Sequence, residues 1–171
     1  MKILNIHGFR GDQHNAAYGA LTDNGHEVIS PATDYDSEKP KDILDKLRGI
    51  IDTESIDMLA GTSLGGFYAA VLSAEYGMPA VLINPCLMPY YHLPKLGYEG
   101  DIREYIEISG KLAALDAENI HCIIGGSDEV IDTHSFDMRL FGEDRITIIP
   151  EGMHSGATLP LKEYFKTIIA E

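Results

Sequence analysis

Residues 58–70 read MLAGTSLGGFYAA, and this stretch decides which class of fold the chain adopts. It begins with a short apolar run, typical of a buried strand, and ends with small residues that favour a helix. Between the two runs Ser63 stands in the pattern Gly-x-Ser-x-Gly, with Gly61 before it and Gly65 after it. A strand that turns at once into a helix forces its central residue into a sparsely populated backbone conformation, and glycines leave room for that turn. The stretch therefore predicts a strand, a tight turn that exposes the Ser63 hydroxyl, and a helix.

The rest of the chain repeats this alternation of strand and helix. Apolar, β-rich runs predict strands at 2–8, 27–31, 55–61, 79–85, 120–126 and 144–150. Helical periodicity and helix-ending residues predict helices at 15–26, 41–52, 64–77, 101–115, 133–142 and 161–170. Short apolar strands that alternate with helices form parallel βαβ units, so we expect a doubly wound α/β fold with about six mostly parallel strands and helices on both faces.

Length and composition limit the classes of protein to which this chain belongs. Its 171 residues suit a single domain over 1–171, in which we expect residues 86–110 to form a small cap-like insertion. The net charge of −14 excludes nucleic acid and anionic membranes as favoured partners. The N-terminus lacks a signal-segment pattern, and no apolar run approaches the roughly 20 residues of a membrane helix. Because cysteine occurs only at Cys86 and Cys122, a cytoplasmic location is the simplest interpretation.

Polar residues follow four of the predicted strands, at the sheet edge where ligands bind in such folds. They are HGFRGD (7–12), GTSLGG (61–66), GGSDEVID (125–132) and PEGMHSG (150–156). A serine between a strand and a helix, an acid after a later strand and a histidine after the last strand give the order Ser, Asp, His. Ser63, Asp128 and His154 fill these positions, and Asp132 competes with Asp128 as the acid.

This set of residues suits acyl transfer through a covalent intermediate. A serine hydroxyl is a weak nucleophile, so we expect His154 to take its proton and Asp128 to orient the imidazole ring. We expect the N–H groups of Leu64 and Phe9 to form an oxyanion hole. The alternative is a purely structural turn in which the Ser63 side chain caps the following helix.

Other residues are weaker candidates for contact with a substrate. Arg10 either binds a substrate carboxylate or phosphate or is a solvated loop residue. Tyr90 and Tyr91 either line an acyl pocket or pack an irregular loop. Cys86 is expected to be a buried bystander. The histidines show no metal-ligand spacing, and GTSLGG lacks the Gly-Lys-[Ser/Thr] ending of a phosphate-binding loop, so we expect no metal and no cofactor.

The motifs IHGFRG, GTSLGGFYAA, INPCLMP, GGSDEVID and PEGMHSG together resemble the small bacterial esterases of the YqiA type, within the α/β-hydrolase superfamily. The resemblance covers nearly the whole chain. It implies a minimal α/β-hydrolase fold without the two N-terminal strands of larger hydrolases, and activity on carboxylic esters or acyl thioesters. Two departures leave the Ser, Asp and His positions intact: Ser127 replaces a glycine common before the aspartate, and GMHS replaces a GNHAF-like context.

The sequence therefore predicts a serine hydrolase for small-molecule esters or thioesters with short-to-medium acyl groups. Only the segment between Cys86 and about Gly110 could cover the site, which is too short for a large lid over a long lipid chain. Two alternatives stay open: a catalytically silent protein that uses the fold to bind a ligand or partner, and a hydrolase of small amides. The sequence leaves the oligomeric state open.

Overall fold

A computed structural model describes residues 1–169 of the chain, and within them six strands form one parallel sheet in the order β2-β1-β3-β4-β5-β6. The strands are β1 (Lys2–Ile6), β2 (Glu27–Ile29), β3 (Met58–Thr62), β4 (Ala80–Ile83), β5 (Ile120–Gly125) and β6 (Ile146–Ile149). Every neighbouring pair is parallel, with registers such as Leu4 opposite Leu59 and Gly61 opposite Leu82. Parallel strands need crossover connections, and the helices supply them.

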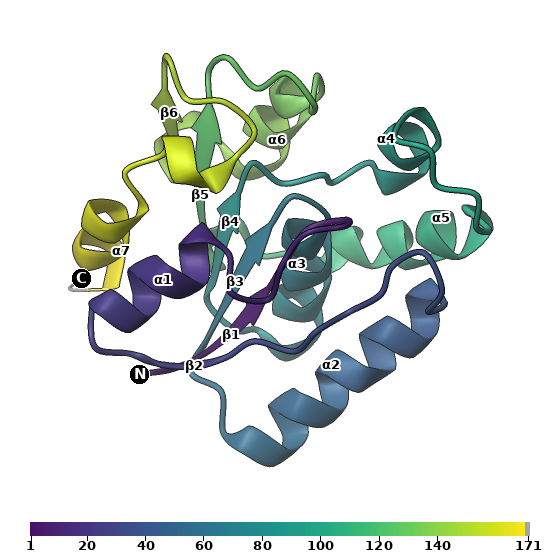
Figure 1. Cartoon of the computed structure of the whole chain (residues 1–171), viewed down its shortest axis with the longest axis horizontal. Coiled ribbons are helices and arrows are strands. Elements are labelled where there is room, and N and C mark those ends of the chain that lie inside the picture. The colour runs from purple at the N-terminus through teal and green to yellow at the C-terminus, as the bar shows by residue number, and fades with distance from the viewer. Residues whose placement is uncertain (170–171) are drawn as a thin grey trace.

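Helices cover both faces of the sheet (Figure 1). They are α1 (Ala16–Asp23), α2 (Pro40–Glu54), α3 (Leu64–Tyr76), α4 (Pro89–Lys95), α5 (Arg103–Ser109), α6 (His134–Phe141) and α7 (Leu161–Ile169). Short 3₁₀ helices lie at η1 (Gly110–Ala114), η2 (Ala117–Asn119), η3 (Glu143–Arg145) and η4 (Gly156–Thr158). Apolar residues of α1 and α7 pack in one core cluster, and those of α2, α3, α5 and α6 pack in the other. The predicted fold class, a single α/β domain with helices on both faces, is confirmed.

The strands are apolar because both of their faces are buried. In β4, Ala80 and Leu82 belong to the core under α3, whereas Val81 and Ile83 belong to the core under α1 and α7. All of these side chains have 0% exposure. Successive side chains of one short strand thus point to opposite faces of the sheet and pack in two different hydrophobic cores.

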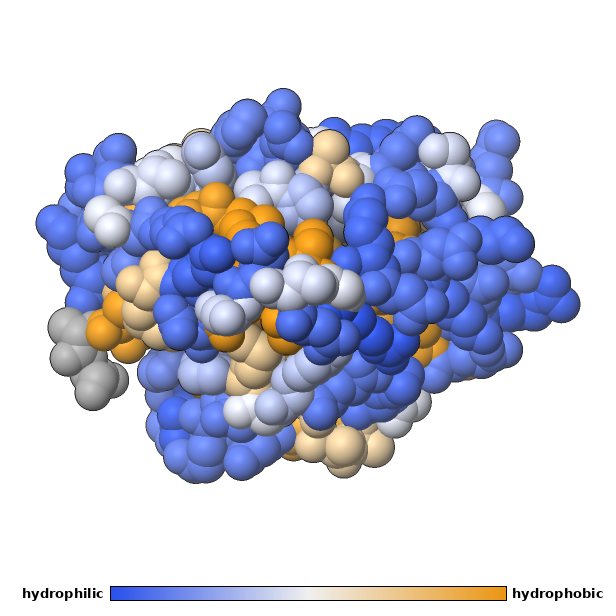
Figure 2. Space-filling view, turned by 90° about the horizontal axis from the view of Figure 1, so that it is seen from below, coloured by the Kyte–Doolittle hydropathy of each residue, from blue (hydrophilic) through white to orange (hydrophobic). Residues whose placement is uncertain are grey.

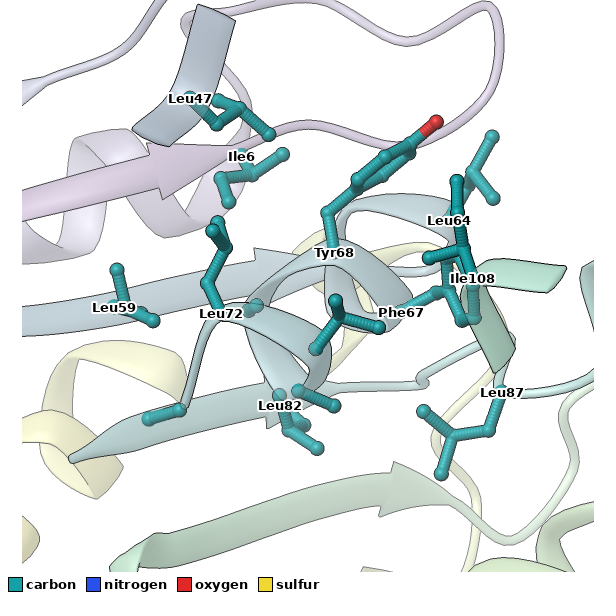
Figure 3. Close-up of a cluster of buried hydrophobic side chains, with 14 of the residues drawn as sticks. Ile6, Leu47, Leu59, Leu64, Phe67, Tyr68, Leu72, Leu82, Leu87 and Ile108 are labelled. Carbon is teal, nitrogen blue, oxygen red and sulfur yellow. The ribbon is translucent and has the colours of Figure 1, made fainter. Parts of the chain in front are cut away.

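Helix α3 lies at the centre of the larger core and is buried from Leu64 to Ser73. Figure 3 shows Phe67, Tyr68 and Leu72 extending from this helix among side chains of the sheet and of the neighbouring helices. A helix that is apolar on all sides is typical of such a buried position. Truncating a buried aromatic side chain such as Phe67 costs about 3–5 kcal/mol, so this helix is held rigidly against the sheet.

The sheet contains a switch point between β1 and β3. From β1 the chain passes to β2 at the sheet edge, and it then returns to form β3 on the other side of β1. The loop after β1 leads to α1 on one face, and the loop after β3 leads to α3 on the other. Loops that diverge in this way leave a crevice beyond the carboxyl ends of the strands. Ser63 and the residues after Ile6 both lie at this crevice.

The segment after β4 differs from the sequence prediction. No helix was predicted between 77 and 101, but α4 lies there, and Pro89 stands in its first turn, where its missing N–H removes no hydrogen bond. The helix expected over 101–115 is divided into α5 and the tighter η1 at Gly110. Tyr98 and Tyr105 from this segment pack edge-to-face, and Tyr105 also contacts Phe67. The segment is thus anchored to the core beside α3.

The face in Figure 2 is mostly hydrophilic, and hydrophobic residues reach it in separate areas. None of the helices within residues 1–169 combines the length and the apolar character that crossing a membrane requires.

Candidate active site

Ser63 occupies a strained turn between β3 and α3. Its backbone angles are φ +54° and ψ −118°, a region that non-glycine residues rarely occupy. The Ser63 N–H donates to the carbonyl oxygen of Ile83, and the Ser63 carbonyl accepts from the N–H groups of Gly66 and Cys86, each over 2.9 Å. The Ser63 side chain makes no capping hydrogen bond to α3. The turn therefore leaves the hydroxyl available for a contact outside the helix.

Three glycines make this turn sterically feasible. A Cβ atom at Gly61 would overlap the backbone of Gly65, and a Cβ atom at Gly65 would overlap the carbonyl oxygen of Ile6. A Cβ atom at Gly66 would lie 2.9 Å from the Cβ atom of Pro85. The glycine spacing seen in the sequence thus allows the start of α3 to contact β1 and the residues after β4.

The structure brings Ser63, His154 and Asp128 together in one chain of hydrogen bonds. Nε2 of His154 lies 3.0 Å from Oγ of Ser63. Nδ1 of the same ring lies 3.0 Å and 2.9 Å from the two carboxylate oxygens of Asp128. When Nδ1–H donates to the carboxylate, Nε2 is left as an acceptor for the Ser63 hydroxyl. Residues 91 positions apart in the sequence therefore meet with the geometry of a nucleophile and its base.

Asp128 is almost completely buried, with 2% of its side chain exposed. Burial alone disfavours the ionised carboxylate, but donors from several directions outweigh that effect. The N–H groups of Val130 and Ile131 donate to Oδ1 over 2.8 Å and 2.9 Å, and His154 and His134 face the same carboxylate. These donors hold the pKa of Asp128 far below its ordinary value. Asp128 is thus a fixed anion.

The loop that carries His154 is held by residues from other strand ends. The side-chain amide of Asn84, which is fully buried, donates to the carbonyl oxygens of Met153 and His154 over 2.9 Å and 2.8 Å. Its Oδ1 accepts from the N–H of Gly125 over 2.7 Å. Glu129 accepts from the His154 N–H over 3.0 Å. Asn84 follows a buried strand, but its position in the sequence does not indicate these contacts.

A second histidine, which no motif in the sequence singled out, contacts Asp128. Nε2 of His134 lies 2.9 Å from Oδ2 of Asp128, and Nδ1 lies 2.6 Å from Oδ2 of Asp137. Both carboxylates raise the proton affinity of the ring against the effect of burial, and the pKa of His134 rises to about 9. The only signal in the sequence was a histidine six residues after the predicted acid, followed by Asp137 one helical turn later.

The loop after β1 has a fixed orientation next to Ser63. The N–H of Thr33 donates to Nε2 of His7 over 3.1 Å, so Nδ1 of His7 carries the proton and donates to the Gly8 carbonyl over 2.9 Å. The N–H of Gly11 donates to the same carbonyl oxygen over 2.9 Å. In a planar trans peptide the C=O and the following N–H point in opposite directions. The N–H of Phe9 therefore points away from His7.

A groove of about 330 Å³ opens beside Ser63 and His154. It lies between the loop after β1, the first turn of α1 and the loop after β6. Its lining residues are His7, Gly8, Phe9, Gly11, Asp12, Asn15, Ala16, Ala17, Thr62, Ser63, His154, Ser155, Gly156 and Ala157. Small side chains predominate, and Asp12 is the only acidic residue among them. The groove is at the small end of the size range of ligand pockets.

The weaker candidates lie elsewhere, since none of Arg10, Tyr90 and Tyr91 lines this groove. The guanidinium of Arg10 forms an ion pair with Asp36, with its Nε 2.7 Å from Oδ2. It also donates to the carbonyl oxygens of Leu96 and Gly97, each over 3.2 Å. Arg10 therefore joins the loop after β2 to the segment after α4, which leaves no support for the expectation that it binds a substrate anion.

The aromatic candidates and the alternative acid lie outside this groove too. Tyr90 packs partly buried against the larger core, and Tyr91 is 43% exposed beneath the ammonium group of Lys95. Asp132 lies 3.7 Å from His92 and from Lys95, whereas Asp128 is the acid that contacts His154. Cys86 is buried, and burial raises the pKa of its thiol to about 12, which leaves it unreactive as a nucleophile.

Comparisons with known proteins agree with this architecture. The model of a family described as an uncharacterised protein family, UPF0227, matches residues 2–170. Est1E from Butyrivibrio proteoclasticus is similar in structure, with a TM-score of 0.71 and 16% identity over 99% of this chain and 88% of that one. A structure of the metagenome-derived lipolytic enzymes LipS and LipT gives a TM-score of 0.72 and 16% identity over 99% of this chain and 94% of that one.

A putative hydrolase of the alpha/beta superfamily from Xanthomonas campestris pv. campestris has a TM-score of 0.64 and 19% identity, over 99% of this chain and 98% of that one. At these identities the likeness concerns the fold. The chain has the α/β-hydrolase fold, as the motifs in its sequence predicted.

Proposed function

This chain belongs to the uncharacterised protein family UPF0227, the YqiA family, and from the contacts around Ser63 we propose that it is a serine hydrolase. It cleaves carboxylic esters or acyl thioesters with short-to-medium acyl groups through an acyl-enzyme. The observation that carries this proposal is the 3.0 Å contact between Ser63 Oγ and His154 Nε2, on a ring whose Nδ1 faces Asp128 at 2.9 Å. The order Ser, Asp, His along the chain supports the same assignment.

The first chemical step forms the acyl-enzyme. Ser63 Oγ attacks the acyl carbon of the substrate while His154 Nε2 takes its proton. Asp128 accepts a hydrogen bond from Nδ1–H of His154, which keeps the proton on Nδ1 and leaves Nε2 free to act as the base. Its negative charge also stabilises the imidazolium that forms. The negative charge of Asp128 is already in place before the reaction, so no reorganisation is needed when the positive charge develops.

The tetrahedral intermediate carries an oxyanion that needs donors. The N–H of Leu64 is among the first of α3, and such groups have no partner within their own helix. The N–H of Phe9 points away from His7, because the Gly8 carbonyl is held by two donors on the other side. We assign both N–H groups to the oxyanion hole. Loss of one such donor typically costs about 10²–10³-fold in kcat.

Collapse of the first tetrahedral intermediate completes the acyl-enzyme: His154 gives its proton to the leaving alkoxide or thiolate, and the acyl group stays on Ser63. In the second half of the reaction water enters, loses a proton to His154 and attacks the acyl carbon. When this second tetrahedral intermediate collapses, His154 returns the proton to Ser63 Oγ and the acid leaves. One histidine thus acts as base and as acid in each half of the cycle.

The backbone strain at Ser63 supports an active enzyme over a silent binding protein. A residue held at φ +54° costs of order 1–3 kcal/mol, and such strain concentrates at working sites. A serine that only bound a ligand or ended a strand would have no need of this conformation. The strained turn aims Oγ at His154 instead of at the helix that follows.

The groove supports small, neutral substrates. The walls include the small residues Ala16, Ala17, Gly156 and Ala157, and Asp12 places a negative charge beside them. Each methylene that enters an apolar groove gains about 0.8 kcal/mol, and this gain stops where the groove ends. A polyanionic leaving group meets repulsion from Asp12 and from the net charge of −14.

Hydrolysis of p-nitrophenyl acetate and butyrate by the protein and by its Ser63→Ala variant tests the proposal. The wild-type protein is expected to show turnover, and Ser63→Ala is expected to lose roughly 10⁴-fold in kcat while retaining its circular dichroism spectrum. A variant that kept near-normal rates would overturn the assignment of Ser63. The matching anilides and acyl-CoA thioesters then distinguish amide and thioester cleavage from ester cleavage.

A further inference from the structure

The chain of hydrogen bonds does not end at Asp128. His134, at the start of α6, lies between two carboxylates, 2.9 Å from Asp128 and 2.6 Å from Asp137. The exposed fractions of these side chains are 11% for His134, 2% for Asp128 and 0% for Asp137. The proposed reaction uses neither His134 nor Asp137. Burial of an imidazole and a carboxylate is costly unless they are paired and hydrogen-bonded, and here His134 bonds both Asp137 and Asp128.

The contacts fix how many protons this cluster holds. Asp128 accepts from two backbone N–H groups and from His154, so it is ionised, and the Nε2 of His134 that faces it must carry a proton. The contact between Nδ1 of His134 and Oδ2 of Asp137 then needs one further proton between its two atoms. Whether that proton resides on nitrogen or on oxygen, the His134–Asp137 pair holds one proton more than a neutral imidazole beside a carboxylate.

We propose that His134 and Asp137 form a buried second histidine–carboxylate pair that keeps this proton throughout the reaction and positions Asp128 by donating Nε2–H to its Oδ2. His134 is therefore a positioning residue, acting on the acid from the side opposite to His154. The pKa shifts of both groups agree with a retained proton. Against the effect of burial, two carboxylates raise the pKa of His134 to about 9, and burial raises the pKa of Asp137.

The second pair has a consequence for the pH dependence of the reaction. Asp128 accepts from both rings, and the proton held by the His134–Asp137 pair offsets the charge of Asp137. One net negative charge rather than two therefore faces His154. The acid limb of the rate profile is therefore expected at lower pH than it would be without the retained proton.

Other ionisable groups around the pair do not carry the charge that this effect needs. They are Asp132, His92 and Lys95 on the side of α4, Glu129 beside Asp128 and His154, and Cys86 and Cys122 on the side of the sheet. Burial lowers the pKa of His92 and raises that of both thiols, so these three groups are neutral near pH 7. Asp132, Lys95 and Glu129 are exposed, and solvent screens their charges.

Nuclear magnetic resonance of the wild-type protein with ¹⁵N-labelled histidine tests the proton count without any substrate. We expect the His134 ring to keep protons on both nitrogens from pH 6 to pH 8, with the Nδ1 proton shifted far downfield by Asp137. A ring that titrates near the ordinary value of about 6.5 would overturn the proposal. In Asp137→Asn, His134 should lose its proton at a pH at least about one unit lower than in the wild-type protein.

The second experiment rests on the proposed hydrolase activity. His134→Gln keeps an N–H donor for Asp128 but no charge, whereas His134→Leu removes both. The acid limb of the kcat/KM profile should move upward by about half a unit to one unit in both variants, because the retained proton is lost. The value of kcat/KM on the plateau of this pH profile should fall about 10-fold in His134→Leu and less in His134→Gln.

The matched control is His92→Gln, which removes a buried histidine whose Nε2 contacts Thr133, the residue before His134. We expect this variant to leave the acid limb in place. An unchanged acid limb in folded His134→Gln would overturn the role of the pair. If the wild-type protein hydrolyses no ester, the proposed function fails, but the proton count from magnetic resonance still decides whether the pair exists.

Discussion

The α-carbon of Gly65 packs against the carbonyl oxygen of Ile6 so closely that a Cβ atom would overlap that oxygen. This contact joins the first turn of α3 to the end of β1. It fixes Ser63 next to the loop that carries Gly8, whose own Cβ position lies 3.0 Å from the Cβ atom of Ser63. The nucleophile and one half of the proposed oxyanion hole are therefore aligned by backbone contact.

Gly65→Ala should consequently destabilise the protein by about 2–4 kcal/mol, because backbone atoms must move to admit the methyl group. Gly49→Ala is the matched control, since Gly49 lies in α2 with no atom near its Cβ position and should gain about 0.5–1 kcal/mol. Urea unfolding of both variants measures the difference. Equal stabilities would mean that the Gly65 contact has little importance for the fold.

Asp128 and Asp132 compete in the sequence for the role of the acid, and the geometry separates them. Asp128→Asn should lower kcat by about 10⁴-fold, because the amide no longer fixes the donor side of the His154 ring. Asp132→Asn should change kcat by less than about twofold, since its carboxylate is 65% exposed and lies 3.7 Å from His92 and from Lys95. Steady-state kinetics of the two variants with one ester decide the assignment, and the reverse pattern would move the acid to Asp132.

The groove predicts a limit on the length of the acyl chain. We expect kcat/KM for p-nitrophenyl esters to rise from acetate to butyrate and to fall before palmitate. Ala157→Phe fills the groove from an exposed wall position and should shift the optimum to shorter chains. Ala113→Phe, an exposed alanine outside the groove, is the control and should leave the profile unchanged. A wild-type preference for palmitate would contradict the small-groove proposal.

The His134–Asp137 pair also predicts how stability depends on pH. The folded pKa of His134, about 9, lies above its ordinary value, so its contribution is complete below about pH 6.5 and is lost as pH rises through 9. The difference in unfolding free energy between the wild-type protein and His134→Gln/Asp137→Asn should shrink across that window, by at most about 1.4 kcal/mol per pH unit. Chemical denaturation at several pH values measures it, and a constant difference would argue against a retained proton.

The fold was predictable because its signals are local. The alternation of apolar strands and helices needs only short windows of sequence, and it led to the parallel sheet that the structure contains. The positions of Ser63, Asp128 and His154 could also be predicted from the sequence, because the carboxyl ends of parallel strands all lie at the same edge of the sheet. Their contact follows from chain order once that sheet is assumed.

The remaining contacts depend on tertiary structure that no short window contains. Arg10 pairs with Asp36 and with carbonyl groups more than 80 residues away, so its sequence neighbours could not reveal its role. His134 meets Asp128 only because the chain between them turns back at Val130 and Ile131, where both N–H groups bond to the same carboxylate. The spacing of six residues between Asp128 and His134 does not by itself predict that their side chains meet.

The central claim is that His154 activates Ser63 as a nucleophile, and covalent labelling with a fluorophosphonate tests it most directly. Intact-mass measurement and peptide mapping should find one phosphonyl group per chain on Ser63, with labelling lost in Ser63→Ala and slowed by at least about 10³-fold in His154→Ala. A protein that stays unlabelled, or that is labelled at another residue with Ser63 unmodified, would contradict the account.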